Sequence, residues 1–419
     1  MMTQLNEPLL MDITPAWLAD FSKDQGEPGW ALDLRLKALT HFLALPWPDK
    51  KSETWKRTNL ESMPLSSLRL SLAPETMAHP NGSSESPAKQ DEGLLRYSLR
   101  EAFLKEPDSL HSLWEDALRK ATNNKFHTLA LAVGQSGTLL MIKKGMKIKT
   151  PVHLLSPAET PLRARFPLQF ILLDEGAEAQ IWEENGTGAA ASSSDPGFVA
   201  SSTLIHLKKD ARVNFIHLER GSSNLIHFNF ENVIQDESSV FNSVDVQVGA
   251  HLFRNETHLD LRGRGAINKI LGVLLGDGTQ SFENWITQKH EAPQTTSDIQ
   301  FRGALKGASK SFFSGLVSIV KSAQQSDAYQ GAKHLLLSKD ARADAIPNLE
   351  ILADDVKCSH GAAVGPVDED QKYYLETRGI SPADAEKMIV QGFLEPVIAE
   401  VPSESVQDQL RTLIEEKVS

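Results

Sequence analysis

Short apolar runs separated by turn residues fill the middle of this 419-residue chain, and helical patterns lie on either side of them. From about Leu129 to Leu375 no long helical periodicity appears. Residues 170–182 and residues 204–218 each show the order strand, charged turn, small residue, strand. The same turn chemistry recurs at intervals of about 27 to 43 residues, in Asp236-Glu237-Ser238, Arg262-Gly263-Arg264-Gly265, Lys306-Gly307-Ala308 and Lys339-Asp340-Ala341.

A loose repeat of this kind is typical of stacked coils, in which each turn buries its apolar face against its neighbours. The pattern therefore predicts a mainly β chain with a central right-handed parallel β-helix over residues 129–375, flanked by α-helical regions at both ends. A two-sheet sandwich is the alternative that the pattern alone leaves open. The polar run from Gly186 to Gly197 is expected to form a loop between turns of the coil.

Residues 1–128 are expected to be helical and rich in loops, and to pack rather than to catalyse. Thr14 followed by Pro15 predicts a helix start, and residues 30–45 fit a second helix that ends before Pro46. The Pro, Asn, Gly and Ser residues of 73–93 indicate a flexible insertion. Helical spacing returns over Leu95–Ala121, where one stripe contains Leu110, Leu113 and Trp114.

Residues 376–419 return to a helical pattern. Ser381-Pro382 with Asp384 resembles a capping box, and Pro396 is expected to end or kink the helix that follows. A second helix is expected from about Ser403. The pattern leaves open whether these helices pack on the chain or meet a partner. Their expected apolar faces are Ala385, Met388, Ile389 and Phe393 in the first, and Val406, Leu410, Leu413, Ile414 and Val418 in the second.

The composition narrows the classes of function. The net charge of −12 argues against electrostatic binding to nucleic acid or to an anionic membrane. No apolar run approaches the roughly 18 residues that span a bilayer, and the first residues lack the features of a signal peptide. A single cysteine excludes a disulfide within this sequence. We therefore expect a cytoplasmic protein of about two or three domains.

Cys358 and His360 are the candidate metal ligands of this chain. On a strand, alternation places both side chains on one face. Metal sites and iron-sulfur clusters usually need four ligands, so this pair forms at most half a site and a second chain would supply the rest. Cysteine is also a common small buried hydrophobe, and a nearby histidine is commonly just hydrogen-bonded, so the spacing alone does not decide for ligation.

The residues around this pair resemble the SufB/SufD family of iron-sulfur cluster assembly proteins, and the likeness is to SufD-type members. Similar segments include Pro347-x-Leu349-Glu350-Ile351, Ala353 to Gly361 with Cys358 and His360 inside it, and Tyr374-Leu-x-x-Arg-Gly-Ile380. Glu53-Thr-Trp55-Lys56-Arg-Thr58 resembles the motif that opens SufD-type chains. Further likeness lies in His290 to Ser297, Phe313-Ser-Gly315 and Leu335 to Ser338. The resemblance implies the β-helix as well.

The resemblance implies a non-catalytic scaffold subunit of a SufBCD complex, which pairs with SufB and binds the ATPase SufC through its C-terminal helices. That complex builds a transient iron-sulfur cluster and passes it to apoproteins, and a reduced flavin can be associated with it. His360 is the first expected ligand of cluster or iron, at the contact with SufB. Cys358 is the second, as a thiol whose acidity Lys357 would increase. With one cysteine, the chain is not expected to be the main acceptor of sulfur, and without SufB it is a candidate homodimer.

Other readings keep a place beside this one. A purely structural adaptor would use Cys358 and His360 for packing alone, and a β-helical carbohydrate enzyme would need acidic pairs on neighbouring turns. Residues 303–311 miss the phosphate-loop spacing, Gly263-x-Gly265 lacks the third glycine of a dinucleotide site, and no serine elbow is present. Five histidines without ligand spacing are expected mostly on the faces of the turns or on the surface: 206, 217, 227, 251 and 258.

Overall fold

The computed structural model describes residues 8–49, 51–58, 60, 63, 65–71, 92–157, 162–187, 196–401 and 403–418. The insertion expected at 73–93 therefore lies outside the described residues, except for its last two positions. Most of the loop expected between Gly186 and Gly197 lies outside them too. None of the helices in the described part of the chain has the length and apolar composition that crossing a bilayer requires.

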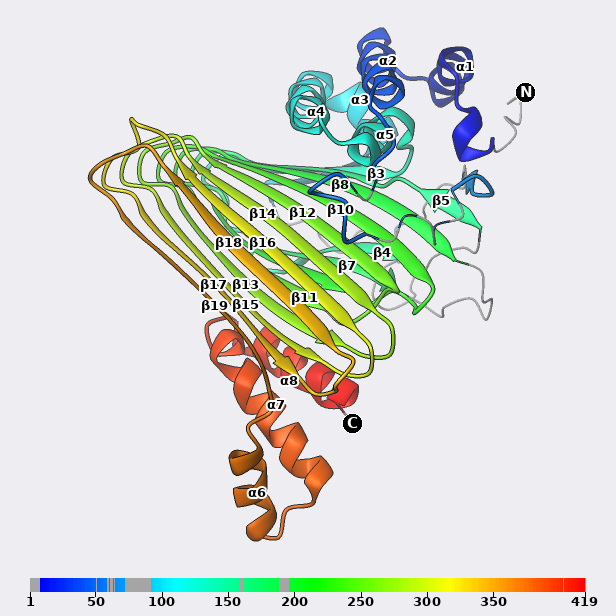
Figure 1. Ribbon diagram of the computed structural model, residues 1–419. Coiled ribbons are helices and arrows are strands. Elements are labelled where there is room, and N and C mark those ends of the chain that lie inside the picture. Colours follow the sequence, from blue (N-terminus) through cyan, green and yellow to red (C-terminus); the bar gives the residue numbers. More distant parts are fainter. Residues whose placement is uncertain are drawn as a thin grey trace.

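Two parallel β-sheets face each other and form a solenoid of about seven turns, as Figure 1 shows. Successive strands alternate between the sheets, so each strand pairs with the strand one full turn away. This connectivity confirms the predicted parallel β-helix and excludes the sandwich. One sheet has the order β18(Arg342–Ile351)-β16(Lys310–Ile319)-β14(Ser281–His290)-β12(Leu252–Leu261)-β10(Leu225–Gln235)-β8(Gly197–Leu207)-β6(Leu168–Leu173)-β3(Gly137–Ile142)-β2(Leu94–Ser98), with the short β1(Arg69–Leu70) and β5(Arg163–Arg165) beside it.

The second sheet closes the other side of the solenoid. Its strands are parallel throughout, whereas β2 pairs with β3 in the antiparallel direction at one end of the first sheet. The order of the second sheet is β19(Lys357–Pro366)-β17(Asp327–Leu336)-β15(Thr296–Leu305)-β13(Ile267–Gly276)-β11(Val240–Gln247)-β9(Arg212–Glu219)-β7(Glu178–Thr187)-β4(Val152–Pro157).

The predicted turns fall between strands, and their chemistry fits their backbone. Gly176, Asp210, Ser238 and Gly265 occupy equivalent turns with φ between 55° and 70°. Glycine adopts this left-handed conformation freely, and Asp tolerates it better than most residues. The turns also bond to one another, because the amide of Asp210 donates to the carbonyl of Glu237 at 2.9 Å, one turn further on. Turn chemistry thus sets the spacing of the coil.

Five N-terminal helices cover the outer face of the first sheet (Figure 1). Aromatic side chains form much of this contact, for example Phe126 against Phe198 and Phe228. One prediction was wrong, because residues 94–98 form strand β2 and not the start of a helix; their backbone pairs with β3 across some forty residues of chain. The helices are α1(Pro15–Gln25), α2(Gly29–Ala44), α3(Leu99–Lys105), α4(Pro107–Ala121) and α5(Lys125–Val133), after a short 3-10 helix at Leu10–Asp12.

The segment around Trp55 attaches the N-terminal region to the outer face of the first sheet. The guanidinium of Arg254, on β12, lies 3.9 Å from the centre of the Trp55 ring. Arg254 is buried and donates from Nη1 to the carbonyl of Thr54 at 2.9 Å and to the carboxylate of Glu283 at 2.7 Å. The hydroxyl of Thr58 donates to the same carboxylate at 2.7 Å. We call these five residues the Arg254 clamp.

Three C-terminal helices follow the solenoid: α6(Glu369–Thr377), α7(Pro382–Ile398) and α8(Glu404–Val418). Helix α6 begins before residue 375, the expected end of the strand region. The stripe predicted in α8 is buried at Val406, Leu410 and Ile414 against the outer face of the second sheet. The face predicted for α7 was partly wrong: Val390, Leu394 and Val397 are buried, whereas Met388 is exposed. Pro396 lies inside α7, which ends two residues later.

Candidate functional site

The last turn of the solenoid carries both candidate ligands. Among the described residues, strands β18 and β19 each have a neighbour on one side only, so the described solenoid ends there with two unpaired strand edges. Cys358 pairs in register with Ala328 and His360 with Gln330, and both residues on β17 are buried. Side chains in register on parallel strands point the same way, so Cys358 and His360 both point toward the interior of the solenoid.

In the part of the chain that the structure describes, no further turn covers these inward-pointing side chains, and we call this surface the open end. In the preceding turn, the equivalent positions Phe313, Val317 and Ile319 are fully buried. At the open end, Val364 on β19 is 43% exposed, and Leu352, directly after β18, is 61% exposed. The inward-pointing residues of the open end are Ala343, Ala345, Pro347, Leu349 and Ile351 on β18, and Cys358, His360, Ala362 and Val364 on β19.

Cys358 and His360 differ in their surroundings. Cys358 is half-buried against a small apolar cluster that includes Ala328. Burial raises the pKa of the Cys358 thiol, and the nearby charge of Asp327 raises it further, while a backbone hydrogen bond from Ala328 has the opposite effect. The acidification expected from Lys357 was therefore wrong; that side chain is exposed and points to the opposite face of β19.

His360 is exposed, and its imidazole has no hydrogen-bond or ion-pair partner among the described residues. Its nitrogen atoms are free to bind a group brought by another molecule. In the described ranges no three His, Cys, Asp or Glu side chains form a group that could hold a metal ion. Any ion at the open end would thus need ligands from outside this chain.

Gln330 lies beneath His360 and was missed by the sequence analysis. Its Nε2 donates to the carbonyl of Asn348 on β18 at 2.8 Å, so it joins the two sheets one layer below the open end. Its Oε1 is buried and has no hydrogen-bond partner among the residues that the structure describes. A Cβ atom on Gly315 would lie 2.0 Å from that oxygen, which explains the glycine in the Phe313-Ser-Gly315 segment. In the sequence, Gln330 is one of many polar residues that alternate with apolar ones along the strands, so the pattern does not distinguish it.

A second set of ionisable side chains lies deep inside the solenoid. It includes His217 and His227, which belong to the histidines expected mostly on the faces of the turns or on the surface. His217 contacts Asp245 at 3.1 Å, and His227 contacts Glu219 at 2.5 Å. All four side chains are buried. Two more buried carboxyls, Glu183 and Glu231, lie near them. We call these six residues the interior network. The sequence does not reveal such a network, because alternating polar residues give the same pattern whether they face the interior or the solvent.

The interior shifts the pKa values of this network strongly. Burial by itself would lower the pKa of His217, but the hydrogen bond and charge of Asp245, with Glu183 and Glu219, raise it to about 9. Burial raises the pKa of Glu231 to about 8, helped by Glu183 and Asp245 and opposed by His217. Burial also raises the pKa of Glu183, whose Oε2 has no hydrogen-bond partner in the described structure. At neutral pH the network therefore holds a charged His217 and a neutral Glu231.

A family model described as SUF system FeS cluster assembly, SufBD core domain, matches residues 155–393, from β4 to α7. This match covers more than half of the chain and includes the open end. The chain belongs to the SufBD family. The SufBD family is a scaffold-type family of iron-sulfur cluster assembly, and the match includes most of the solenoid with its open end.

Curated SufBD relatives match the chain along nearly its whole length. SufD of Bacillus subtilis is 29% identical over 97% of this chain and 98% of that protein. SufB of the same organism is 25% identical over 96% of this chain and 92% of its own length. A SufBD family protein of Staphylococcus epidermidis is 26% identical over the same shares. The expected family membership is confirmed, and the likeness extends beyond the core to the helical regions.

Proposed function

We propose that this chain is the SufD-type subunit of a SufB–SufC–SufD complex, and that it pairs with a SufB chain through the open end. The observation that carries this proposal is the uncapped last turn: its edges have free backbone hydrogen-bonding groups, and apolar side chains such as Val364 are exposed there. An exposed strand edge is a template for pairing with another chain. The identity to a SufD over almost the full length of both chains supports the choice of subunit.

His360 is the ligand we propose for iron or for the nascent cluster, which is the cargo of the complex. Its exposed imidazole lies at the open end, where the proposed partner would pair. Cys358 is the second proposed ligand. Because burial and Asp327 raise the pKa of its thiol, Cys358 is protonated at neutral pH and would need the metal itself to release its proton. SufB would supply the remaining ligands.

A structural adaptor without cluster ligation is the second candidate function. The observation that favours it is the packing of Cys358 in an apolar cluster with Val317 and Ala328. Neither role assigns a flavin to this end of the chain. The inward-pointing residues there are apolar or uncharged apart from the titratable Cys358 and His360, and none has a permanent positive charge for the diphosphate of a flavin dinucleotide.

The ligand role and the adaptor role are distinguished by reconstitution without oxygen of this protein with SufB and SufC. We compare the wild type with His360→Ala, and use His111→Ala, a half-buried histidine on α4 far from the open end, as the control. Visible absorption measures the cluster and size exclusion measures the complex. A ligand role predicts an intact complex with diminished absorption for His360→Ala alone. An intact complex with full absorption would assign the adaptor role, and a weakened complex would assign His360 to packing.

The hairpin of α6 and α7 is the surface we propose for SufC. Figure 1 shows it projecting away from the solenoid, and none of the α6 residues is buried. Tyr373 is 68% exposed, Tyr374 is 57% exposed, and Met388 on α7 is 48% exposed. Aromatic residues and Met are enriched at protein interfaces, whereas monomeric proteins rarely keep such residues together in water. The faces of α7 and α8 that pack on the sheet are unavailable for this contact.

Tyr374→Ala should weaken binding to SufC at least tenfold if the tyrosine is a central contact, because truncating such a residue commonly costs about 2 kcal/mol or more. The thermal midpoint of the isolated chain should not change, since the side chain is mostly in solvent. Leu104→Ala, at an exposed position on α3 on the other side of the molecule, is the control. Titration calorimetry with purified SufC measures both variants. Equal affinity of Tyr374→Ala and the control would place the SufC contact elsewhere.

A further inference from the structure

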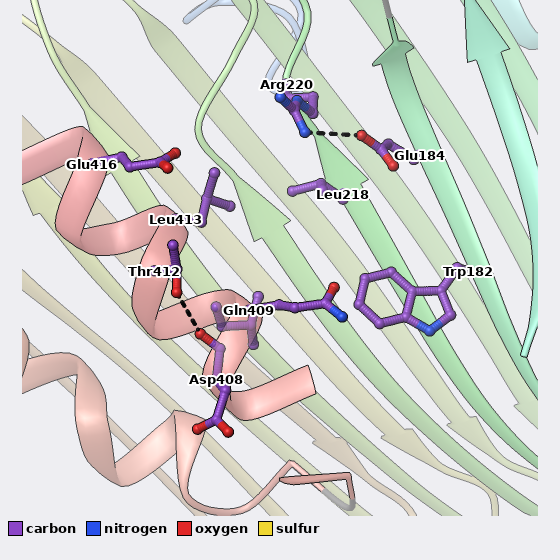
Figure 2. Close-up of a pocket in the computed structure, with 10 residues that line it drawn as sticks. Trp182, Glu184, Leu218, Arg220, Asp408, Gln409, Thr412, Leu413 and Glu416 are labelled. Carbon is purple, nitrogen blue, oxygen red and sulfur yellow. Dashed lines mark hydrogen bonds and ion pairs between the residues drawn. The ribbon is translucent and has the colours of Figure 1, made fainter. Parts of the chain in front are cut away.

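A groove of about 380 Å³ lies on the outer face of the second sheet, far along that sheet from the open end. Strands β7 and β9 form one wall, and helix α8 forms the other (Figure 2). Neither the pairing with SufB nor the α6–α7 hairpin uses this surface. The residues that line it are Trp182, Glu184, Leu218, Arg220, Asp408, Gln409, Leu410, Thr412, Leu413 and Glu416.

The floor of the groove is apolar and fixed in place. Trp182, Leu218 and Leu410 belong to the buried cluster that holds α8 against the sheet, and Leu413 packs partly on the same cluster. The ring of His153, on the edge strand β4, stacks on the indole of Trp182 with 5.8 Å between ring centres. Because sheet and helix hold these side chains from both sides, the groove is formed before any ligand arrives.

The rim of the groove carries three carboxylates and one guanidinium. Arg220 pairs with Glu184 at 3.1 Å on the strand side, as the upper dashed line of Figure 2 shows. On the helix side, Asp408 accepts from Arg411, which lies outside the groove, at 2.9 Å. Glu416 has no partner among the described residues. The helix side of the rim is therefore negative, with one carboxylate that nothing in the described structure neutralises.

We propose that this groove binds a segment of a partner protein that presents an apolar side chain next to an arginine or a lysine. The apolar side chain would cover Leu218, Leu413 and the accessible edge of Trp182. The cation would lie against Glu416, and Asp408, about two helical turns away on α8 (Figure 2), would attract a second cation of the segment. The open shape, shared between a helix and a strand face, suits side chains projecting from a polypeptide. The same carboxylates repel phosphate groups, which argues against nucleic acid as the occupant.

The test uses the full chain and a soluble probe, an acetylated and amidated peptide in which leucine and arginine alternate. The indole N–H resonance of Trp182 in ¹⁵N-labelled protein, assigned with Trp182→Phe, reports on the groove. We expect a saturable shift of this resonance that weakens as salt is added. Asp408→Asn combined with Glu416→Gln should weaken binding roughly twofold to twentyfold, the range for two exposed ion pairs. Glu404→Gln, on an exposed residue of the same helix outside the groove, should bind like the wild type.

Any of the following outcomes would overturn the proposal. The first is no shift of the Trp182 resonance at saturating peptide. The second is an equal response to the matched peptide of leucine and glutamate, or unchanged affinity in the Asp408→Asn, Glu416→Gln variant. The third is an equal response to acetyl-arginine amide alone, which would identify a site for a small cation. None of these measurements involves SufB or SufC, so this proposal and the proposed function fail or stand separately.

Discussion

His217 and Glu231 show how a protein interior can reverse the usual charge of two side chains. At neutral pH an isolated histidine is mostly neutral and an isolated glutamate is charged. Inside the solenoid the opposite holds, because the pKa of His217 is about 9 and that of Glu231 is about 8. Both groups bind protons more tightly in the folded chain than in the unfolded chain. Their effects on stability therefore have the same sign.

We predict that the folded state loses stability as the pH rises from about 6.5 to 9. Below pH 6.5 the buried His127, His290 and His334 act in the opposite direction, because burial lowers their pKa values. Glu231 contributes between its unfolded pKa near 4.5 and its folded pKa of about 8, and His217 between 6.5 and about 9. The shift of Glu231 alone corresponds to roughly 3 to 5 kcal/mol over its interval. Thermal midpoints measured across this pH range test the prediction.

Glu231→Gln should flatten this pH dependence and raise the thermal midpoint at pH 8, because the amide keeps the shape of the neutral acid and cannot ionise. Glu237→Gln changes an exposed glutamate in a turn and is the control. A wild-type midpoint that is constant from pH 6.5 to 8 would contradict the shifted pKa of Glu231. So would a Glu231→Gln curve parallel to that of the wild type.

Cys358 and His360 also illustrate how far sequence reasoning extends for single positions. The period of a strand suffices to place the two side chains on one face, as predicted. Whether that face is the inner or the outer face of the solenoid depends on the register with Ala328 and Gln330. The local sequence pattern does not specify how strands distant in the sequence pair. The raised pKa of Cys358 depends likewise on burial in the fold and then on Asp327, thirty-one residues earlier, and not on the adjacent Lys357.

Among the elements, the Arg254 clamp connects a segment near residue 55 to strands two hundred residues later. The sequence marks this segment through its likeness to SufD-type chains, and the structure supplies a physical reason for the motif. Trp55 covers the guanidinium of Arg254, and Thr58 shares the Glu283 carboxylate with it. The clamp is the polar part of a contact that is otherwise made by aromatic rings.

Arg254→Met should destabilise the chain by about 3–5 kcal/mol, because Glu283 would remain buried without its cation and the carbonyl of Thr54 would lose its donor. Lys56→Met, next to the clamp, removes only an exposed pair with Glu53 and should leave stability nearly unchanged. Urea unfolding followed by circular dichroism compares the two variants. Similar midpoints for both would mean that the aromatic contacts alone fasten the N-terminal region.

The positions of helices and turns were more predictable than the strands and surfaces against which they pack. The turns of the solenoid follow from charged, small and left-handed residues that act locally, so their positions were correct. Strand β2 was missed because residues 94–98 have a helix-compatible pattern, and their partner β3 lies elsewhere in the chain. The buried face of α7 was displaced, since helical spacing alone does not tell Met388 from Val390 until the sheet beneath the helix is known.

In the molecule as a whole, the two ends of the solenoid differ in how far other elements of the chain cover them. At the first end, β2 turns the edge of one sheet to antiparallel pairing, and α3 follows directly from it. At the open end, both sheets stop without a cap in the described structure, although neighbouring turns of such repeats stabilise one another and end turns usually need covering. This difference in covering is the reason for assigning the partner contact to one end.

Val364→Glu should abolish pairing with SufB, and also the homodimer that we propose for the isolated chain. The new carboxylate would have to be buried against the partner without a counterion. Ile267→Glu changes a similarly exposed apolar residue at the start of β13, away from the open end, and should assemble normally. Size exclusion with light scattering measures both, and circular dichroism confirms folding. A normal complex with Val364→Glu would remove the open end from the interface.

The missing neighbour of the last turn also has a consequence for motion. In a stack where each turn is held by the turns on either side, a turn with one neighbour opens more readily than those inside the stack. Backbone amides of β18 and β19 should exchange hydrogen faster than those of β10 and β11. A partner chain would then act as the next turn and slow this exchange. Assembly with the partner would thereby stabilise β19, the strand that contains His360.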